Sequence, residues 1–156
     1  EKKWNNKAKA FDEKTKKSQM EIDAEYIKKK FELKLTVKAK VTSAYGQRES
    51  DEIVSADHSG IDLGVVVGTT VLAAMEGTVT VVSNEGEYGT HVKIVNKDVT
   101  TIYAHCSKIL VKKGAKIKKG QKIALSGNTG NTTGPHLHFE IRRDNRTVNP
   151  ALVLNF

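Results

Sequence analysis

Short runs that alternate apolar and polar residues recur along the chain from residue 33 onward, with Gly-, Asn- or Lys-rich turns between them. Successive side chains of a β-strand point to opposite faces, so each run can bury one face and expose the other. The clearest runs are GTVTVVS, THVKIV, TTIYAHC, QKIALSG and HLHFEIR. With 156 residues, 38% of them hydrophobic, and a single cysteine, the chain must build its core without an internal disulfide. The pattern predicts a mostly β domain.

The run LKLTVKAKV, residues 33–41, alternates apolar residues with lysine and threonine. It predicts a strand with one buried face and one wet, basic face. The polar stretch QRESDEIVSAD, residues 47–57, predicts an exposed loop that precedes His58.

Residues 1–32 differ from the rest because they contain neither glycine nor proline. Their apolar residues fall at helical spacing in two sets that are out of phase, which favours two helical pieces over one coiled coil. The sets are Trp4, Ala8 and Phe11, then Met20, Ala24, Ile27 and Phe31. We interpret residues 1–32 as a basic helical arm near a membrane, either a docking surface or a solvated stalk, and residues 33–156 as the β domain.

Charge is concentrated in the first 40 residues, which include this arm. Residues 1–40 hold 13 lysines against 7 acidic residues, or +6 of the formal net charge of +8. The arm has no arginine and only scattered aromatic residues, so we expect solubility near a membrane rather than nucleic-acid binding. No apolar run reaches the length of a membrane span and no signal peptide is present, yet the chain begins with Glu1, so we interpret it as a fragment.

The octapeptide GPHLHFEI, residues 134–141, sets two histidines two positions apart in a strand-like run. Leu137, Phe139 and Ile141 share one parity, whereas His136, His138 and Glu140 share the other. Two imidazoles on one face of a strand suggest a metal site whose other ligands come from elsewhere in the chain.

Two further segments offer candidate ligands. Ser59 and Gly60 are poor helix residues, so HSGID is expected to be extended, with His58 and Asp62 on the side opposite Ile61. In TIYAHC the alternation places Ile102, Ala104 and Cys106 on one face and Tyr103 and His105 on the other. Zinc often takes nitrogen and carboxylate ligands from three protein groups and leaves a fourth position for water, whose pKa falls from about 15.7 to about 7. A nearby imidazole can then act as a base.

Other residues have simpler interpretations. His91 has no motif around it and is expected at the surface. Cys106 is expected to be a small buried hydrophobe, because adjacent strand residues point apart and cannot pair as thiol and imidazole. The Gly- and Asn-rich stretches at 126–130 and 131–135 lack the lysine and helix of a phosphate-binding loop and are expected to shape the rim of the site.

Several motifs together resemble the lysostaphin/LytM zinc metallopeptidase family over roughly residues 41–154. They are His58-x-x-x-Asp62, Tyr103-Ala-His105, GQKIALSGNTGNTTGPHLHFE and VNPALVL. The resemblance implies an antiparallel β-sheet, sandwich-like metallopeptidase domain that cuts peptide bonds in bacterial peptidoglycan. It also implies that His58, Asp62 and His138 bind Zn²⁺, and that His105 and His136 are the catalytic pair. Members of the family can carry a tyrosine shortly before the first zinc histidine, and residues 46–57 contain none.

A looser resemblance, based on the basic arm and the short site, is to stage II sporulation protein Q of endospore-forming bacteria. It implies an extracytoplasmic domain, anchored in the forespore membrane by an upstream segment, that docks a partner membrane protein across the intermembrane space. In the alternative interpretation the domain is a non-catalytic scaffold whose zinc is only structural. A biotinyl or lipoyl carrier module is a third interpretation, based on AAMEGTVTVVS and VKKGAKIKKGQKIALSG, but the tip-like stretch 74–77 lacks the lysine that carries the cofactor.

Overall fold

The computed structural model of the chain describes residues 18–34, 36–37, 39–47, 57–130 and 134–154, with the backbone alone at 46–47 and 57–58. The first predicted helical piece and most of the predicted loop at 47–57 lie outside these residues. The described elements are α2 (Gln19–Phe31), β1 (Lys40–Ser43), β2 (Gly46–Gln47), β3 (Asp57–His58), β4 (Ile61–Gly64), β5 (Thr70–Leu72), β6 (Gly77–Ser83), β7 (Thr90–Asn96), β8 (Val99–Ile109), β9 (Lys116–Ile117), β10 (Lys122–Ser126), β11 (Leu137–Arg143), β12 (Arg146–Val148) and the 3-10 helix η1 (Pro150–Leu152).

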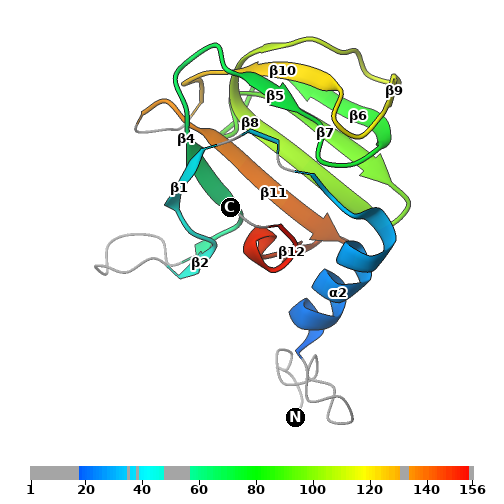
Figure 1. Cartoon of the computed structure of the whole chain (residues 1–156). Coiled ribbons are helices and arrows are strands. Elements are labelled where there is room, and N and C mark those ends of the chain that lie inside the picture. The colour runs from blue at the N-terminus through cyan, green and yellow to red at the C-terminus, as the bar shows by residue number, and fades with distance from the viewer. Residues whose placement is uncertain (1–17, 35, 38, 48–56, 131–133, 155–156) are drawn as a thin grey trace.

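One large antiparallel sheet dominates the described part of the chain (Figure 1). Its main path runs β1-β4-β11-β8-β7-β6-β9, while β10 pairs with β5 and β8, and β12 pairs with β11. Strand β11 lies between β4 and β8, with both of which it forms antiparallel ladders. The predicted mostly β, antiparallel fold is therefore confirmed, and β11 is placed to bring side chains from three strands together.

The core lies on one face of this sheet. Leu137, Phe139 and Ile141 of β11 are fully buried, as their alternation predicts. Ile61 and Leu63 of β4 are also buried, which confirms the extended interpretation of this segment. Burial of each such side chain contributes about 1.5–3 kcal/mol relative to exposure, so this face carries much of the stability of the fold.

Helix α2 packs on the β domain at the end of β11 and β12 (Figure 1). Ser18 and Glu21 form a capping box at its first turn, and Glu32 ends it in the left-handed conformation, with φ of 48°. Ala24 and Ile27 are buried, and they join the same hydrophobic core as the strands. The second predicted helical piece is thus confirmed as a helix, and it docks on the sheet.

The predicted strand at residues 33–41 is largely wrong. Within the described part of this run, regular β1 begins only at Lys40, and Val41 is exposed. Thr36, expected on the wet face, is buried and donates a hydrogen bond from its hydroxyl to the carbonyl of Leu72 at 2.6 Å. A hydrogen bond to a distant segment therefore overrides the local alternation.

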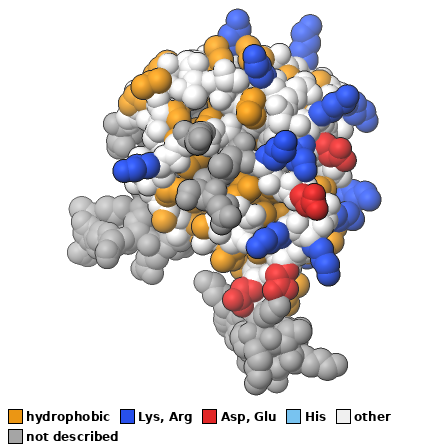
Figure 2. All heavy atoms as spheres, in the orientation of Figure 1, with side chains coloured by type: hydrophobic (Ala, Val, Ile, Leu, Met, Phe, Trp, Pro, Cys, Tyr) orange, Lys and Arg blue, Asp and Glu red, His pale blue; other side chains and the backbone are white. Residues whose placement is uncertain are grey.

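The face of the molecule seen in Figure 2 carries its positive charge in dispersed form. Figure 2 shows Lys and Arg side chains spread around one face, with hydrophobic atoms between them, rather than gathered in a single patch. No helix in the described residues is both long enough and apolar enough to span a membrane.

Candidate metal centre

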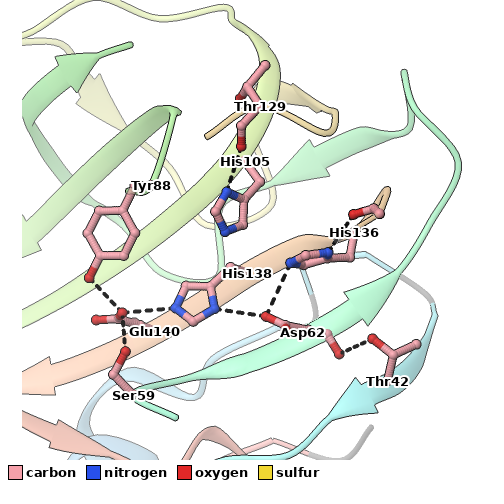
Figure 3. A network of polar contacts seen from close by, with 10 residues as sticks. Thr42, Ser59, Asp62, Tyr88, His105, Thr129, His136, His138 and Glu140 are labelled. Carbon is pink, nitrogen blue, oxygen red and sulfur yellow. Dashed lines mark hydrogen bonds and ion pairs between the residues drawn. The ribbon is translucent and has the colours of Figure 1, made fainter. Parts of the chain in front are cut away.

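The register of β11 with β4 assembles the first part of the site. His138 lies directly opposite Asp62, and its Nδ1 is 2.9 Å from Asp62 Oδ1. His136 lies two residues earlier, directly before β11, and its Nε2 is 3.5 Å from the same oxygen. One carboxylate and two imidazoles predicted from the sequence thus meet at a single atom (Figure 3).

A β-bulge in β8 adds the third imidazole. Thr90 pairs with Cys106 and Val92 with Tyr103, so two residues of β8, Ala104 and His105, lie opposite one residue of β7. His105 adopts a left-handed backbone with φ of 61°. Its ring centroid then lies 5.0 Å from that of His136 and 5.9 Å from that of His138.

The sequence interpretation of β8 was wrong about Tyr103. Tyr103 pairs with Phe139, packs against its ring at 5.4 Å between centroids, and is fully buried on the core face. Simple alternation from Tyr103 would turn His105 into the core as well. The bulge restores His105 to the site face, so its predicted position is correct although Tyr103 does not share it. Cys106 is fully buried, as predicted.

Main-chain carbonyls hold the rings of His105 and His136. His105 Nδ1 lies 2.7 Å from the carbonyl oxygen of Thr129, and His136 Nδ1 lies 2.7 Å from that of Gly134. A carbonyl can only accept, so each Nδ1 carries a proton and a neutral ring presents an unprotonated Nε2. Burial lowers the pKa of His105, and the nearby His136 and His138 lower it further, against the bond to Thr129.

Glu140 forms the floor of the site. It is fully buried and its Oε1 accepts bonds from Ser59 Oγ, Tyr88 OH and His138 Nε2, at 2.6, 2.6 and 2.9 Å (Figure 3). Arg142 Nε donates to Oε2 at 3.0 Å. Burial would raise the pKa of Glu140, but the bonds from His138, Ser59 and Tyr88 outweigh it and lower the pKa to about 2.

His138 lies between two carboxylates. Burial alone would lower its pKa, but the bonds to Asp62 and Glu140 raise it to about 9. Because Glu140 engages Nε2, the nitrogen that faces Asp62 is Nδ1. The imidazole orientation is therefore fixed at both nitrogens.

Comparisons with known proteins identify the family of the chain. The family model described as Peptidase family M23 matches residues 56–150, which is more than half of the chain. The chain belongs to peptidase family M23. A curated relative, peptidoglycan DD-endopeptidase ShyA of Vibrio cholerae, is 46% identical over 95 residues, covering 60% of this chain and 22% of ShyA. The chain thus spans less than a quarter of that relative.

Solved M23-like structures share the fold. A zinc-containing peptidase from Vibrio cholerae superposes with a TM-score of 0.69 and 38% identity, covering 74% of this chain and 37% of that one. A complex of SpoIIIAH and SpoIIQ contains a chain that superposes with a TM-score of 0.66 and 26% identity, covering 74% and 92%. The resemblance to the lysostaphin/LytM peptidases is therefore confirmed at the level of the family, whereas the sporulation protein is a more distant structural relative.

M23 membership implies zinc, and the donor set can be tested against it. Asp62 Oδ1 and His138 Nδ1 are oxygen and nitrogen donors that already converge, and buried Glu140 engages the other nitrogen of His138, an arrangement common behind metal-bound histidines. No three of the described His, Cys, Asp and Glu side chains are arranged so that they could hold one metal ion together. The side chain of the third predicted ligand, His58, lies outside the described atoms; its backbone pairs with Gly46. The donors present fit zinc.

His91 was wrongly expected at the surface. It is 6% exposed, its Nδ1 lies 2.8 Å from the carbonyl oxygen of Gly89, and its ring packs edge-on against Tyr88 at 5.1 Å. The ring of Tyr88, in the turn before β7, packs against His91, and the local sequence pattern does not reveal this contact.

Sequence reasoning also missed Ser59, Tyr88, Thr129 and Arg142. Ser59 lies between the two predicted ligands His58 and Asp62, and Arg142 continues the parity of His138 and Glu140, so both had a local signal. Tyr88 and Thr129 come from turns whose position depends on the whole sheet. Thr129 lies in the stretch 126–130, which confirms that this turn borders the site.

Proposed function

We propose that this domain is a zinc-dependent metallopeptidase that hydrolyses peptide bonds in peptidoglycan. The observation that carries the proposal is the shared orientation of His105 and His136: both rings are held at Nδ1 by main-chain carbonyls, beside the Asp62–His138 pair. A purely structural metal site has no need for two additional oriented imidazoles.

His58, Asp62 and His138 would hold the zinc. The bound ion would supply Lewis-acid chemistry that polarises the scissile carbonyl and acidifies water. Asp62 would supply a carboxylate oxygen and His138 an imidazole nitrogen as neighbouring ligands, and Glu140 would hold the His138 ring in place.

His105 and His136 would handle protons and charge. Burial keeps His105 neutral near neutral pH, so its Nε2 can accept a proton from the attacking water. His136 Nε2 lies beside Asp62 Oδ1, where a proton on that nitrogen would stabilise the oxyanion or pass to the leaving amine. Which histidine serves each step is separable by comparing His105→Ala with His136→Ala.

The substrate class follows from the relatives. ShyA is named a peptidoglycan DD-endopeptidase and is 46% identical over its matched region. We therefore propose the peptide cross-links between peptidoglycan stems as the bonds cleaved.

Digestion of purified peptidoglycan tests this activity. Wild-type domain should release new amine ends, a chelator should abolish the release, and added zinc should restore it. His105→Ala should retain zinc and lose cleavage, whereas Asp98→Ala, which changes a partly exposed carboxylate at the far end of β11, should cleave normally. Stable zinc binding with no cleavage of any peptidoglycan preparation would contradict the proposal.

A scaffold role is the second candidate, favoured by the structural similarity to the SpoIIQ chain of the SpoIIIAH–SpoIIQ complex. In this role the domain would be extracytoplasmic, anchored in a forespore membrane through a basic, membrane-proximal arm, and would bind a partner membrane protein. A fluorescent fusion of the full-length protein in its own bacterium should then gather at the forespore membrane during sporulation. Uniform labelling of the cell envelope would contradict this role.

A further inference from the structure

Glu140 is the shared hydrogen-bond acceptor of the groups that surround His138. Its Oε1 accepts from three groups on three different segments: Ser59 before β4, Tyr88 before β7, and His138 within β11. Arg142 binds the other oxygen. A fully buried carboxylate with four donors has no freedom to rotate, so His138 Nε2 meets a fixed acceptor.

Space around Glu140 is also closed. A Cβ atom at Gly60 would lie 2.3 Å from the carbonyl oxygen of Phe139 and 2.7 Å from Glu140 Cγ, so the chain entering β4 runs directly against this carboxylate. Tyr88 covers the other side, with its ring stacked on the His138 ring at 5.9 Å and an interplanar angle of 30°. The imidazole is therefore held by contact as well as by hydrogen bonds.

Tyr88 reaches both halves of the site. Its hydroxyl donates to Glu140, while its carbonyl oxygen accepts from the backbone N–H of His105 at 2.8 Å, at the bulge that turns His105 toward the site. The loop that carries Tyr88 touches the Thr129 loop so closely that a Cβ at Gly89 would lie 2.5 Å from the nitrogen of Gly130. Thr129 is the residue whose carbonyl orients the His105 ring.

We propose that Glu140 and Tyr88 are positioning residues that lock His138 with its Nδ1 toward Asp62, in register with His105. The inference rests on the proposed zinc function but concerns residues outside the proposed zinc ligands and the proposed catalytic pair. It predicts that zinc affinity, and not only stability, depends on the Tyr88 hydroxyl, since without it one donor to Glu140 is lost and the carboxylate can turn away from His138 Nε2.

The decisive experiment compares two tyrosine variants of the purified domain. Tyr88→Phe removes the hydroxyl that binds Glu140. Tyr103→Phe is the matched control: it removes another buried hydroxyl, which contacts the backbone N–H of Ala74 and Thr101 Oγ1 away from the site. Zinc affinity is measured by competition with a chromogenic chelator, and folding by circular dichroism and thermal melting.

We expect Tyr88→Phe to weaken zinc binding about 10-fold and Glu140→Gln by about 10- to 100-fold, the range typical for residues that orient metal-bound histidines. Tyr103→Phe should melt earlier but bind zinc like the wild type. Ring ¹⁵N shifts of His138 should change in Tyr88→Phe and stay unchanged in Tyr103→Phe.

Equal zinc affinity of Tyr88→Phe and wild type would overturn the inference while leaving the zinc function intact. Equal losses in Tyr88→Phe and Tyr103→Phe would also overturn it, since they would reveal a general effect of destabilisation. If Glu140→Gln does not fold, Tyr88→Phe still decides. A wild-type domain that binds no zinc would overturn both the inference and the proposed function.

Discussion

Two buried carboxylates, Asp23 of helix α2 and Glu140 in the site, are both almost completely inaccessible, at 1% and 0% exposure. Asp23 is bound by Arg143 and Arg146, which stay charged at any ordinary pH. Glu140 is bound by a serine, a tyrosine and a histidine as well as by Arg142.

The difference lies in the donors. Permanently charged arginines suit the contact between helix α2 and the sheet, whose role is structural. Hydroxyl and imidazole donors suit Glu140, which orients a neighbouring histidine without removing it from the site. The same strand serves both, because Arg142 and Arg143 are adjacent in β11 and point to opposite faces. If this division is correct, changes in one region should leave the other unaffected.

The largest effect is expected at the site. His105→Ala should lower kcat on peptidoglycan by about 100- to 10,000-fold, the contribution usual for a general acid or base. Stability and zinc affinity should change little, because the ring bonds a single carbonyl. Steady-state kinetics with equilibrium zinc titration measure both. A parallel loss of zinc would instead place His105 among the ligands.

At the helix joint, Asp23→Ala should reduce the free energy of unfolding by about 2–4 kcal/mol, since it leaves two arginines without their shared partner. The value lies below that of a fully buried pair because both arginines reach solvent. Urea denaturation measures it. Asp98→Ala, at the partly exposed edge of the same cluster, should cost about 0–1 kcal/mol. A change in zinc affinity of Asp23→Ala would break the proposed independence of the two regions.

Gly60→Ala tests the packing under the site. Its new methyl group would press on the Phe139 carbonyl and on Glu140, so we expect a loss of about 1–3 kcal/mol together with weaker zinc binding. Gly134→Ala is the control, because a Cβ there meets no atom within 4 Å of the described chain. Thermal melts and zinc titrations of the two variants should differ; similar results would show that the close approach at Gly60 is tolerated.

The smallest effect concerns Cys106. Burial raises the pKa of its thiol to about 12, so the folded protein should not react with a disulfide reagent at neutral pH. Labelling followed by mass spectrometry should detect the adduct only under denaturing conditions. Rapid labelling of the native protein would mean that Cys106 reaches the site face beside His105.

The sequence predicted those parts of the site in which strand geometry is regular. In β4 and β11 the pleat is unbroken, so the alternation around Ile61, Asp62 and His138 correctly separates core from site. It failed in β8 for Tyr103, because an extra residue puts Tyr103 and His105 on opposite faces, and at His91, whose burial depends on Tyr88 from a turn. The positions of bulges and turn contacts depend on which strands pair with each other, and the local alternation of residues does not predict this pairing.

The bulge in β8 has a consequence for how such a protein can change over time. In a regular strand each side chain faces one side of the sheet, so only every second residue can contribute an imidazole to the site. One inserted residue moves the side chains of all later residues to the opposite face without any substitution. Deleting Ala104 would place His105 directly after Tyr103, and therefore still on the face opposite Tyr103 and Phe139, but without the extra residue and the left-handed backbone that aim its ring.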